Sequence, residues 1–195
     1  MSVQAQHQDI AALGGHPVNV VDAMRRRRMH RAFAPRPIPA PVLAQLVWAA
    51  GRAQHARAGV RTLVVVDDPA LMRTAREVLP GYVNNSTAMI VIASDLDRLA
   101  EVVGRRGVDH VSRLDSGAAA AHLALAAQCF GIGTCTVTSW SDAGVRALFD
   151  LPETIRPDIT VALGYLPEHP SPTAKGGFGP SVHYNRYGTA FPGEA

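Results

Sequence analysis

The chain is 195 residues long, which predicts a single domain large enough to bury a hydrophobic core. Hydrophobic residues make up 47% of it, which excludes disorder for most of its length. The net charge of +3 is local, because acidic residues slightly outnumber basic ones once the five arginines between positions 25 and 31 are set aside. A nucleic-acid-binding protein usually spreads positive charge over a face, so this pattern favours a pocket and no nucleic-acid partner.

The N-terminal part predicts an arm, a helix and a second helix. Residues 1–17 are rich in Gln, His and Gly and predict a flexible arm, and residues 18–195 predict a single domain with an extended C-terminal tail. Asn19 is expected to cap a short helix that runs into the arginines. Three prolines between positions 35 and 39 stop that helix, and apolar residues at helical spacing then predict a helix from Pro41 to about His55.

The arginine-rich stretch reads Arg-Arg-Arg-Arg-Met-His-Arg-Ala-Phe from Arg25 to Phe33. Like charges at helical spacing repel one another, so the cluster must either stay in water or face a multiply charged anion. The planar guanidinium fork suits phosphate in particular. On composition alone both interpretations stay open.

Four short apolar runs predict buried strands, and the segments between them predict helices. Continuous apolar strands alternating with helices predict an α/β sandwich with helices on both faces of the sheet. Residues 104–115 and 152–157 are expected to form loops. The expected strands are 62–66, 88–93, 134–139 and 159–166, and the expected helices are 70–79, 96–103, 116–130 and 143–149.

Cysteine usage and the apolar runs predict a protein of the cytoplasm. Cys129 and Cys135 cannot build a disulfide framework and have no metal-ligand spacing, so both are expected to be buried thiols. The first residues lack a signal-peptide pattern, and the longest apolar segment, around 117–127, is too short to span a bilayer. We therefore expect no membrane partner.

Self-contained catalytic motifs are absent from the sequence. No dinucleotide fingerprint follows a strand, and no phosphate-binding loop, zinc-protease motif or nucleophile elbow occurs. Asp109-His110 predicts a solvent-facing pair, and His122 on the Ala-rich helix predicts a core histidine. Any redox or group-transfer chemistry would therefore belong to a cofactor.

Several segments, in order, resemble the FMN-dependent nitroreductase family between Val18 and Gly188. The matching segments are Arg27 to Phe33 for the opening Arg-Arg-Ser-x-Arg-x-Phe, Pro37-Ile38-Pro39, the loop from Ala49 to Gly59, the central helix with its Gly131-Ile132-Gly133-Thr134-Cys135 exit, Leu151 to Pro157, Val161 to Tyr165, and Lys175 with the ending His183-Tyr184-Asn185-Arg186-Tyr187-Gly188.

The resemblance implies an α+β fold with a mainly antiparallel sheet, and a tail that wraps the partner subunit of a homodimer with FMN at the interface. It also implies an enzyme in which NAD(P)H reduces the flavin, which then reduces a small organic acceptor in a ping-pong cycle. The residues that it assigns to the cofactor site are Arg27, Arg28 and Arg31 on the phosphate and ribityl chain, Met29 in the same motif, His55 in the loop beside the flavin, the backbone N–H groups of Thr138 and Ser139 near flavin N5 and O4, and Lys175 from the tail.

Three departures from the family pattern keep alternatives open. Met29 replaces a Ser, the loop around His55 lacks the Pro-Ser and the Asn, and Gly176-Gly177 follows Lys175 where an Arg is common. Extra arginines at 25, 26, 57 and 61 offer compensating contacts. The alternatives are a flavin-dependent oxidase or dehydrogenase of a specialised metabolite, and a degenerate flavin-binding protein without catalysis. The acceptor is expected to be chosen by residues 98–113, His55 and Trp140.

Overall fold

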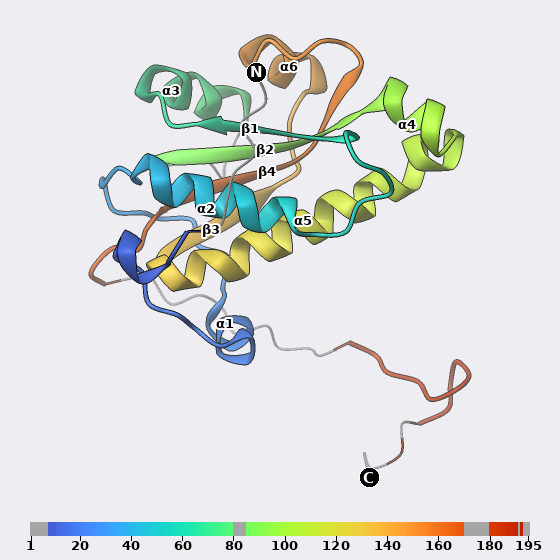
Figure 1. The fold of residues 1–195 in the computed structure, drawn as a ribbon, viewed down its shortest axis with the longest axis horizontal. Helices are drawn as coiled ribbons and strands as arrows, with labels where there is room; N and C mark the ends of the chain where they lie inside the picture. Colours follow the sequence, from blue (N-terminus) through green and yellow to red (C-terminus); the bar gives the residue numbers. More distant parts are fainter. Residues whose placement is uncertain (1–7, 80–84, 170–179, 191, 193–195) are drawn as a thin grey trace.

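A single four-stranded sheet forms the centre of the fold (Figure 1). The computed structural model describes residues 8–79, 85–169, 180–190 and 192. The strands lie in the order β1-β2-β4-β3, and every neighbouring pair is antiparallel. Their bounds are β1 Arg61–Val66, β2 Ala88–Asp95, β3 Ile132–Val137 and β4 Ile155–Tyr165.

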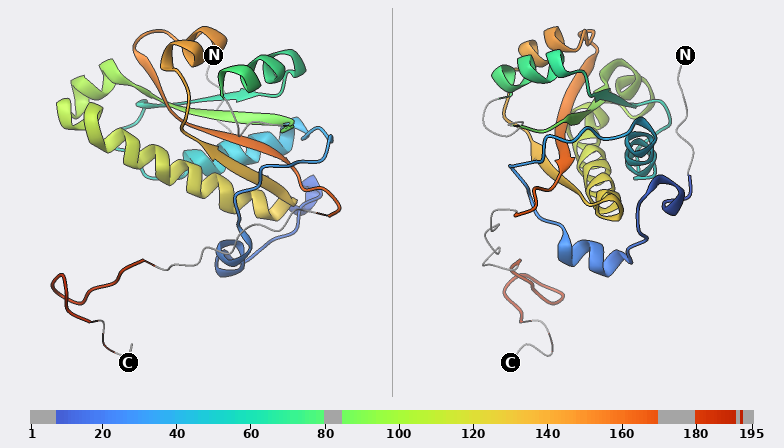
Figure 2. Two further views of the ribbon diagram at one scale, coloured as in Figure 1. Left: turned by 180° about the vertical axis from the view of Figure 1, so that it is seen from behind. Right: turned by 90° about the vertical axis from the view of Figure 1, so that its left-hand side faces the viewer.

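Helices cover both faces of this sheet (Figures 1 and 2). One face carries α2 (Ala40–Gly51) and α5 (Ser112–Ala127), and the other carries α3 (Pro69–Val78) and α6 (Asp142–Leu148). Helix α4 (Leu96–Val102) follows β2 directly. The predicted α+β sandwich with a mainly antiparallel sheet is therefore confirmed.

The two-sided cover explains why the strands read as continuous apolar runs. In β2, every residue from Ala88 to Ser94 is buried, because side chains on both faces meet a layer of helices. Ile90 and Ile92 join the core under α2 and α5, whereas Met89 and Val91 join the core under α3 and α6. A strand with one face in water would alternate apolar and polar residues. Because both faces of β2 are covered, its sequence shows no such alternation.

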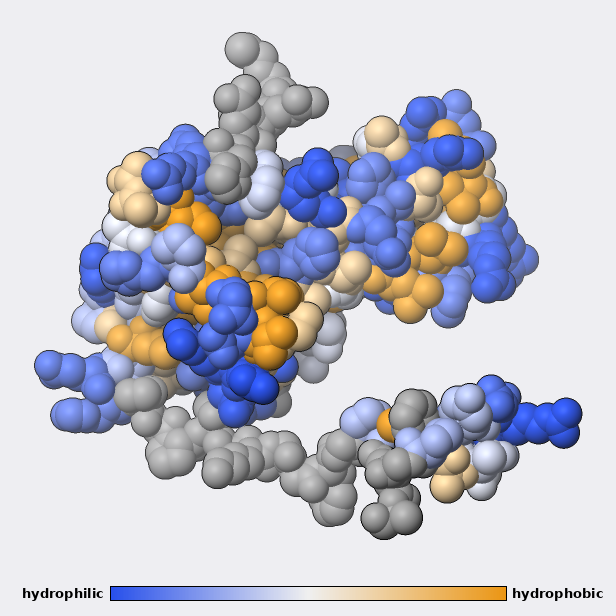
Figure 3. Space-filling view, turned by 60° about the horizontal axis from the view of Figure 1, so that its bottom comes forward, coloured by the Kyte–Doolittle hydropathy of each residue, from blue (hydrophilic) through white to orange (hydrophobic). Residues whose placement is uncertain are grey.

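Helix α1 (Val20–Arg26) lies beside this sandwich and carries the first arginines. The side chain of Asn19 accepts a hydrogen bond from the Asp22 backbone N–H at 2.9 Å, which confirms the predicted cap. The apolar side of α1 faces outward: Val20, Val21 and Met24 are 58%, 51% and 58% exposed. Figure 3, seen from the side of α1, shows apolar and charged residues next to one another on this surface.

Several predicted boundaries are wrong, among them the end of α2, which lies at Gly51 and not near His55. β4 begins at Ile155 and not at 159, so half of the predicted loop 152–157 is strand. α5 begins at Ser112 and not at 116, directly after a π-helical turn, η2 (Gly107–Val111), which occupies the predicted loop. β3 starts two residues earlier than predicted and ends at Val137. Buried polar side chains at the starts of α5 and β4 conceal the apolar periodicity there.

Single residues also differ from the sequence expectations. His122 is exposed on α5, so the prediction of a core histidine is wrong. Cys135 is fully buried as predicted, whereas Cys129 is only half-buried. Asp109 and His110 are exposed, as predicted. None of the helices in the described ranges is long and apolar enough to cross a bilayer.

The described part of the predicted N-terminal arm contacts the body of the protein. The Gln8 backbone N–H donates to Gln45 Oε1 at 3.1 Å, and the His16 N–H donates to the Cys129 carbonyl oxygen at 2.7 Å. Between them lies a short 3-10 helix, η1 (Ala11–Leu13). These contacts join residues 8–16 to α2 and to η3 (Gln128–Phe130), the turn that follows α5.

Candidate functional site

The segment of residues 27–33, here called the arginine strap, crosses the edge strand β3 and ends over β4. Met29 forms a parallel bridge with Thr134, and the His30 backbone N–H donates to the Thr134 carbonyl oxygen at 2.9 Å. Phe33 then inserts into a small core with Cys135 and Ala162. The strap is therefore fixed to the sheet by backbone hydrogen bonds at one end and by an aromatic side chain at the other.

Small residues on β3 and β4 make room for the strap. A Cβ at Gly164 would lie 2.6 Å from the Phe33 Cβ, and a Cβ at Gly133 would lie 3.2 Å from the His30 Cβ. Contacts under 3.0 Å require something to shift. Phe33 can therefore pack against β4 only if residue 164 is a glycine. The position of Phe33 in turn fixes the arginines that precede it.

Replacing Gly164 with valine is expected to displace Phe33 and to loosen the strap. The expected result is a chain with its helical content intact but with weaker binding of FMN, because overpacking of this kind typically costs about 1–3 kcal/mol. Isothermal titration with FMN measures the effect. Gly117→Ala is the matched control, because Gly117 lies exposed on α5 and a Cβ added there would meet nothing within 4 Å. Equal FMN affinity in the two variants would contradict the role given to Gly164.

The three strap arginines have different surroundings. Arg27 is exposed, and its side chain makes no hydrogen bond or ion pair with the residues that the structure describes. Arg28 turns back, and its Nη1 donates to the carbonyl oxygens of Arg25 and Arg27 at 2.6 and 2.8 Å, which satisfies the end of α1. Arg31 is exposed, and its Nη2 donates to Met29 Sδ at 3.3 Å.

The positive charge of the strap reaches its buried neighbours. Burial lowers the pKa of His30, and the nearby Arg28 guanidinium lowers it further. Burial raises the pKa of the Cys135 thiol, and the Arg31 guanidinium partly offsets that rise. Both directions indicate a neutral imidazole and a neutral thiol beneath a positively charged rim.

Thr138 and Ser139 lie just beyond the last ladder pair of β3, which joins Val137 to Thr160. Both residues are exposed, and within the described chain neither backbone N–H donates to another residue. Four residues of extended chain separate Thr138 from Thr134, where Met29 is bridged, a distance of about 13 Å. The strap and these free donors therefore follow the same edge strand.

His55 lies at the other edge of the sheet, because its loop leads into β1 and β1 is the edge strand opposite β3. Three strand spacings, about 14 Å, separate the two edges. One chain therefore brings Arg27, Arg31, Thr138 and Ser139 together along β3 but does not bring His55 to them.

The loop that carries His55 is tied to α5. The Ala56 backbone N–H donates to Asp115 Oδ2 at 2.7 Å, and His55 Nδ1 lies 2.7 Å from the Arg57 carbonyl oxygen. The Arg61 guanidinium donates to the carbonyl oxygens of Ala50, Ala53, Gln54 and Asp115. Burial lowers the pKa of Arg61, and Asp115 opposes that shift. Arg61 therefore holds the loop together and does not extend toward a phosphate.

The donor set on β3 fits FMN. A phosphate needs cationic hydrogen-bond donors, which Arg27 and Arg31 present, and flavin N5 and O4 need donors such as the free N–H groups of Thr138 and Ser139. No carboxylate of the described ranges lies within ion-pair distance of Arg27. Lys175, the remaining predicted contact, lies outside the described residues. Clusters of His, Cys, Asp or Glu able to hold a metal are also absent from the described part.

Sequence reasoning missed a buried polar network next to this site. Arg156 Nε pairs with Asp158 Oδ1 at 2.7 Å, and Asp158 Oδ2 accepts from the hydroxyls of Ser94 and Ser116. Arg156 also donates to Ser112 Oγ at 2.7 Å. The sequence gives only a weak signal for this network: Arg156 and Asp158 lie two positions apart, just before an apolar run.

Comparison with known proteins agrees with this geometry. The sequence model of the nitroreductase family matches residues 77–165, from the end of α3 to the end of β4. The NfrA1 nitroreductase of B. subtilis superposes with a TM-score of 0.72 at 21% identity, covering 87% of this chain and 75% of that one. The chain has the nitroreductase fold.

Other solved nitroreductases superpose over similar lengths. An FMN-dependent nitroreductase from Clostridium difficile gives a TM-score of 0.70 at 20% identity and covers 86% of this chain and 99% of that one. A proposed NADH dehydrogenase/NAD(P)H nitroreductase from Bacteroides thetaiotaomicron gives 0.69 at 22% identity, with 86% and 98% covered. The resemblance to the nitroreductase family read from the motifs is thus confirmed.

Proposed function

We propose that this protein is an FMN-dependent oxidoreductase of the nitroreductase type, reduced by NAD(P)H and reoxidised by a small organic acceptor in a ping-pong cycle. The observation that carries the proposal is the arginine strap bridged to β3, the edge strand that leads to the free N–H groups of Thr138 and Ser139. It supports a phosphate at one end of the strand and a flavin ring at the other. We place the protein in the cytoplasm, without a nucleic-acid or membrane partner.

Bound FMN would supply the redox chemistry, accepting a hydride from the nicotinamide and passing two electrons to the acceptor. The chain's own residues bind and orient. Arg27 and Arg31 would neutralise the phosphate, and the N–H groups of Thr138 and Ser139 would stabilise negative charge on the reduced ring. With a nitro compound as test acceptor, two electrons from NAD(P)H and two protons yield the nitroso compound and water.

We further propose a homodimer with the flavin at its interface. The separation of His55 from the strap supports it, because a second chain can bring its own His55 loop to the strap of the first. The exposed apolar side of α1 supplies surface for such a contact.

The C-terminal segment supports the same proposal. Residues 180–190 form a turn of their own: the His183 and Tyr187 rings are 4.4 Å apart, and the Tyr184 backbone N–H donates to the Thr189 carbonyl oxygen at 2.9 Å. The turn extends away from the body (Figure 1), and Tyr187 is 92% exposed. An ordered turn with exposed aromatic residues is suited to a partner subunit.

Deleting residues 175–195 is expected to weaken the dimer. The expected dissociation constant rises at least about tenfold, the equivalent of losing one contact worth ~1.4 kcal/mol. Analytical ultracentrifugation over a dilution series measures it. The double variant Tyr184→Ser/Tyr187→Ser is a milder companion that keeps the chain length. A truncated chain that dimerises as tightly as the full one would exclude the tail from the interface.

The visible absorption spectrum tests the function itself. Protein loaded with FMN is expected to show flavin bands that bleach when NADPH or NADH is added without oxygen, and that return when a nitro compound is added. Return of the bands with oxygen alone, at the same rate, would favour an oxidase. A protein that takes up no FMN would refute the proposal.

One observation favours a second candidate, a flavin-binding protein without catalysis. Arg31 Nη2 donates to Met29 Sδ, where the family motif has a Ser. The thioether takes up one guanidinium donor and offers no hydroxyl to a phosphate. FMN that binds but is not bleached by either nicotinamide cofactor would support this candidate.

A further inference from the structure

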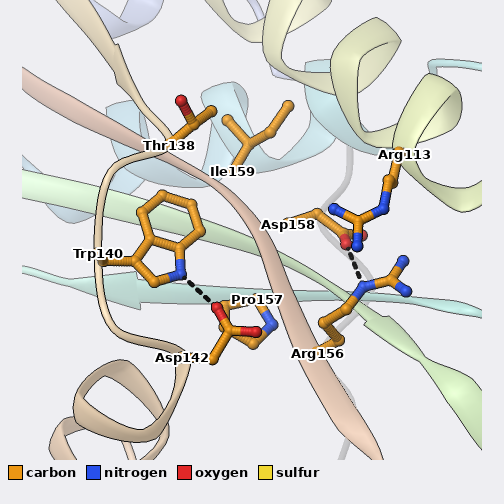
Figure 4. A pocket seen from close by; sticks show the side chains of 8 residues that line it. All are labelled: Arg113, Thr138, Trp140, Asp142, Arg156, Pro157, Asp158 and Ile159. Atoms are coloured by element: carbon orange, nitrogen blue, oxygen red, sulfur yellow. Dashed lines mark hydrogen bonds and ion pairs between the residues drawn. The ribbon is translucent and has the colours of Figure 1, made fainter.

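A cavity of about 310 Å³ opens beside Thr138, at the end of β3 (Figure 4). This volume lies at the lower end of the range for small-molecule sites and suits a molecule with one ring. The cavity lies between the loop after β3, the first part of β4 and the first turn of α5. Its lining residues are Arg113, Thr138, Trp140, Asp142, Arg156, Pro157, Asp158 and Ile159.

Flat apolar side chains form part of its wall. Trp140 lies at one side, with Pro157 and Ile159 nearby (Figure 4). The indole is held in place because Trp140 Nε1 donates to Asp142 Oδ1 at 3.0 Å. A fixed indole at the rim favours a planar aromatic ligand that can stack on it.

Most of the charge around the cavity is already paired. Asp158 is 1% exposed at its side chain and is bonded to Arg156, Ser94 and Ser116. Each of the three guanidinium nitrogens of Arg156 donates a hydrogen bond, to Asp158, the Val108 carbonyl oxygen and Ser112.

Arg113 is the exception among the charged lining residues. It is exposed, points into the cavity (Figure 4), and has no hydrogen-bond acceptor or ion-pair partner among the described residues. Its guanidinium therefore offers a free pair of donors to an anionic group.

The position of Arg113 is specified by the local backbone. The π-helical turn η2 ends one residue before α5 begins, and Arg113 is the second residue of α5. Arg156 fixes this junction through Val108 and Ser112. Gly107 permits the turn, since a Cβ there would lie 2.6 Å from the Val103 Cβ. π-helical turns often occur at functional sites.

We propose that the acceptor is a single-ring aromatic carboxylate, with its carboxylate bound by Arg113 and its ring against Trp140. This inference rests on the proposed function, because Thr138 borders both the cavity and the proposed flavin ring. A phosphate of NAD(P)H has similar anionic chemistry, but the small cavity and its flat apolar wall favour one aromatic ring carrying its own charge.

Trp140 itself can report the binding. In a Trp48→Phe background it is the only tryptophan, since the chain has two. Benzoate is expected to change its fluorescence in protein with and without FMN, and Arg113→Ala is expected to weaken benzoate binding by about tenfold to a hundredfold. Arg113→Lys should recover part of the affinity.

Two controls accompany this assay. Arg73→Ala removes an exposed arginine on α3 and should leave benzoate binding unchanged. Benzyl alcohol has the same ring without the charge and should be insensitive to Arg113.

Steady-state kinetics of the FMN-loaded protein give a second readout. Arg113→Ala should raise KM for 4-nitrobenzoate with little change in kcat, and should leave KM for 4-nitrobenzyl alcohol unchanged. Benzoate and benzyl alcohol that bind equally well, or an Arg113→Ala variant with normal benzoate affinity, would overturn the inference. A raised KM for NADPH alone would overturn it too and assign Arg113 to the donor. Arg113-dependent benzoate binding in a chain that takes up no FMN would refute the proposed function and leave the anion site standing.

Discussion

Replacing Asp158 with alanine is expected to lower the free energy of unfolding by about 3–5 kcal/mol and Tm by about 10 °C. The reason is that Arg156 stays charged with its side chain only 11% exposed, and its partner carboxylate is gone. The Ser94 and Ser116 hydroxyls lose their acceptor at the same time. Chemical denaturation followed by circular dichroism measures the change.

A double variant separates the lost pairing from the lost packing. Arg156→Met/Asp158→Leu removes both charges, so we expect it to be more stable than Asp158→Ala alone. Ser94→Ala removes only one hydrogen bond, and its cost should stay near 1 kcal/mol. If Asp158→Ala were as stable as Ser94→Ala, the ion pair would contribute nothing of its own.

Changing Arg27 and Arg31 together to alanine is expected to release FMN from an otherwise folded protein. Each hydrogen bond from a guanidinium to a phosphate is worth about 1.5–3 kcal/mol, so FMN affinity should fall at least about a hundredfold. Neither side chain is part of a core, and α1 and the strap keep their backbone contacts. Flavin retained after gel filtration gives a direct measurement.

The same cluster supplies the control for that variant. Arg25 and Arg26 lie in the last turn of α1, and among the described residues the Arg25 side chain makes only a long ion pair of 3.9 Å with Asp22. Arg25→Ala/Arg26→Ala removes the same charge from the molecule and should leave FMN binding within about threefold, the size of a long-range charge effect. Equal loss in both double variants would mean that bulk positive charge, and not the strap, attracts the cofactor.

Most of the fold could be predicted, because its apolar patterns are strong where the sheet is covered on both faces. The run at 62–66 and the run at 88–93 are both strands, and the Asn19 cap lies where the sequence placed it. The apolar pattern did not predict the correct element boundaries where η2, α5 and β4 meet. There Asp158 lies at an irregularity of the β2–β4 ladder, so polar residues occupy buried positions and the expected period is lost.

The candidate site could be predicted only in part. The arginines and the residues after β3 could be proposed from the sequence because their motifs are local; their role at a cofactor stays a prediction. The contacts of Arg61 could not be found, because Asp115 lies 54 positions away. The orientation of Arg113 could not be found either, because it depends on the direction of a π-helical turn. Sequence spacing does not record which way a guanidinium points.

The opposite placement of His55 and the strap has a consequence for genetics. In the proposed dimer, each flavin site would take its strap from one chain and its His55 loop from the other. Two defective chains, one altered at Arg27 and Arg31 and the other shortened in its His55 loop, are then expected to complement each other when produced in the same cell. The mixed dimer would hold one intact site and one site with both defects, so inactive alleles of this gene could together restore activity.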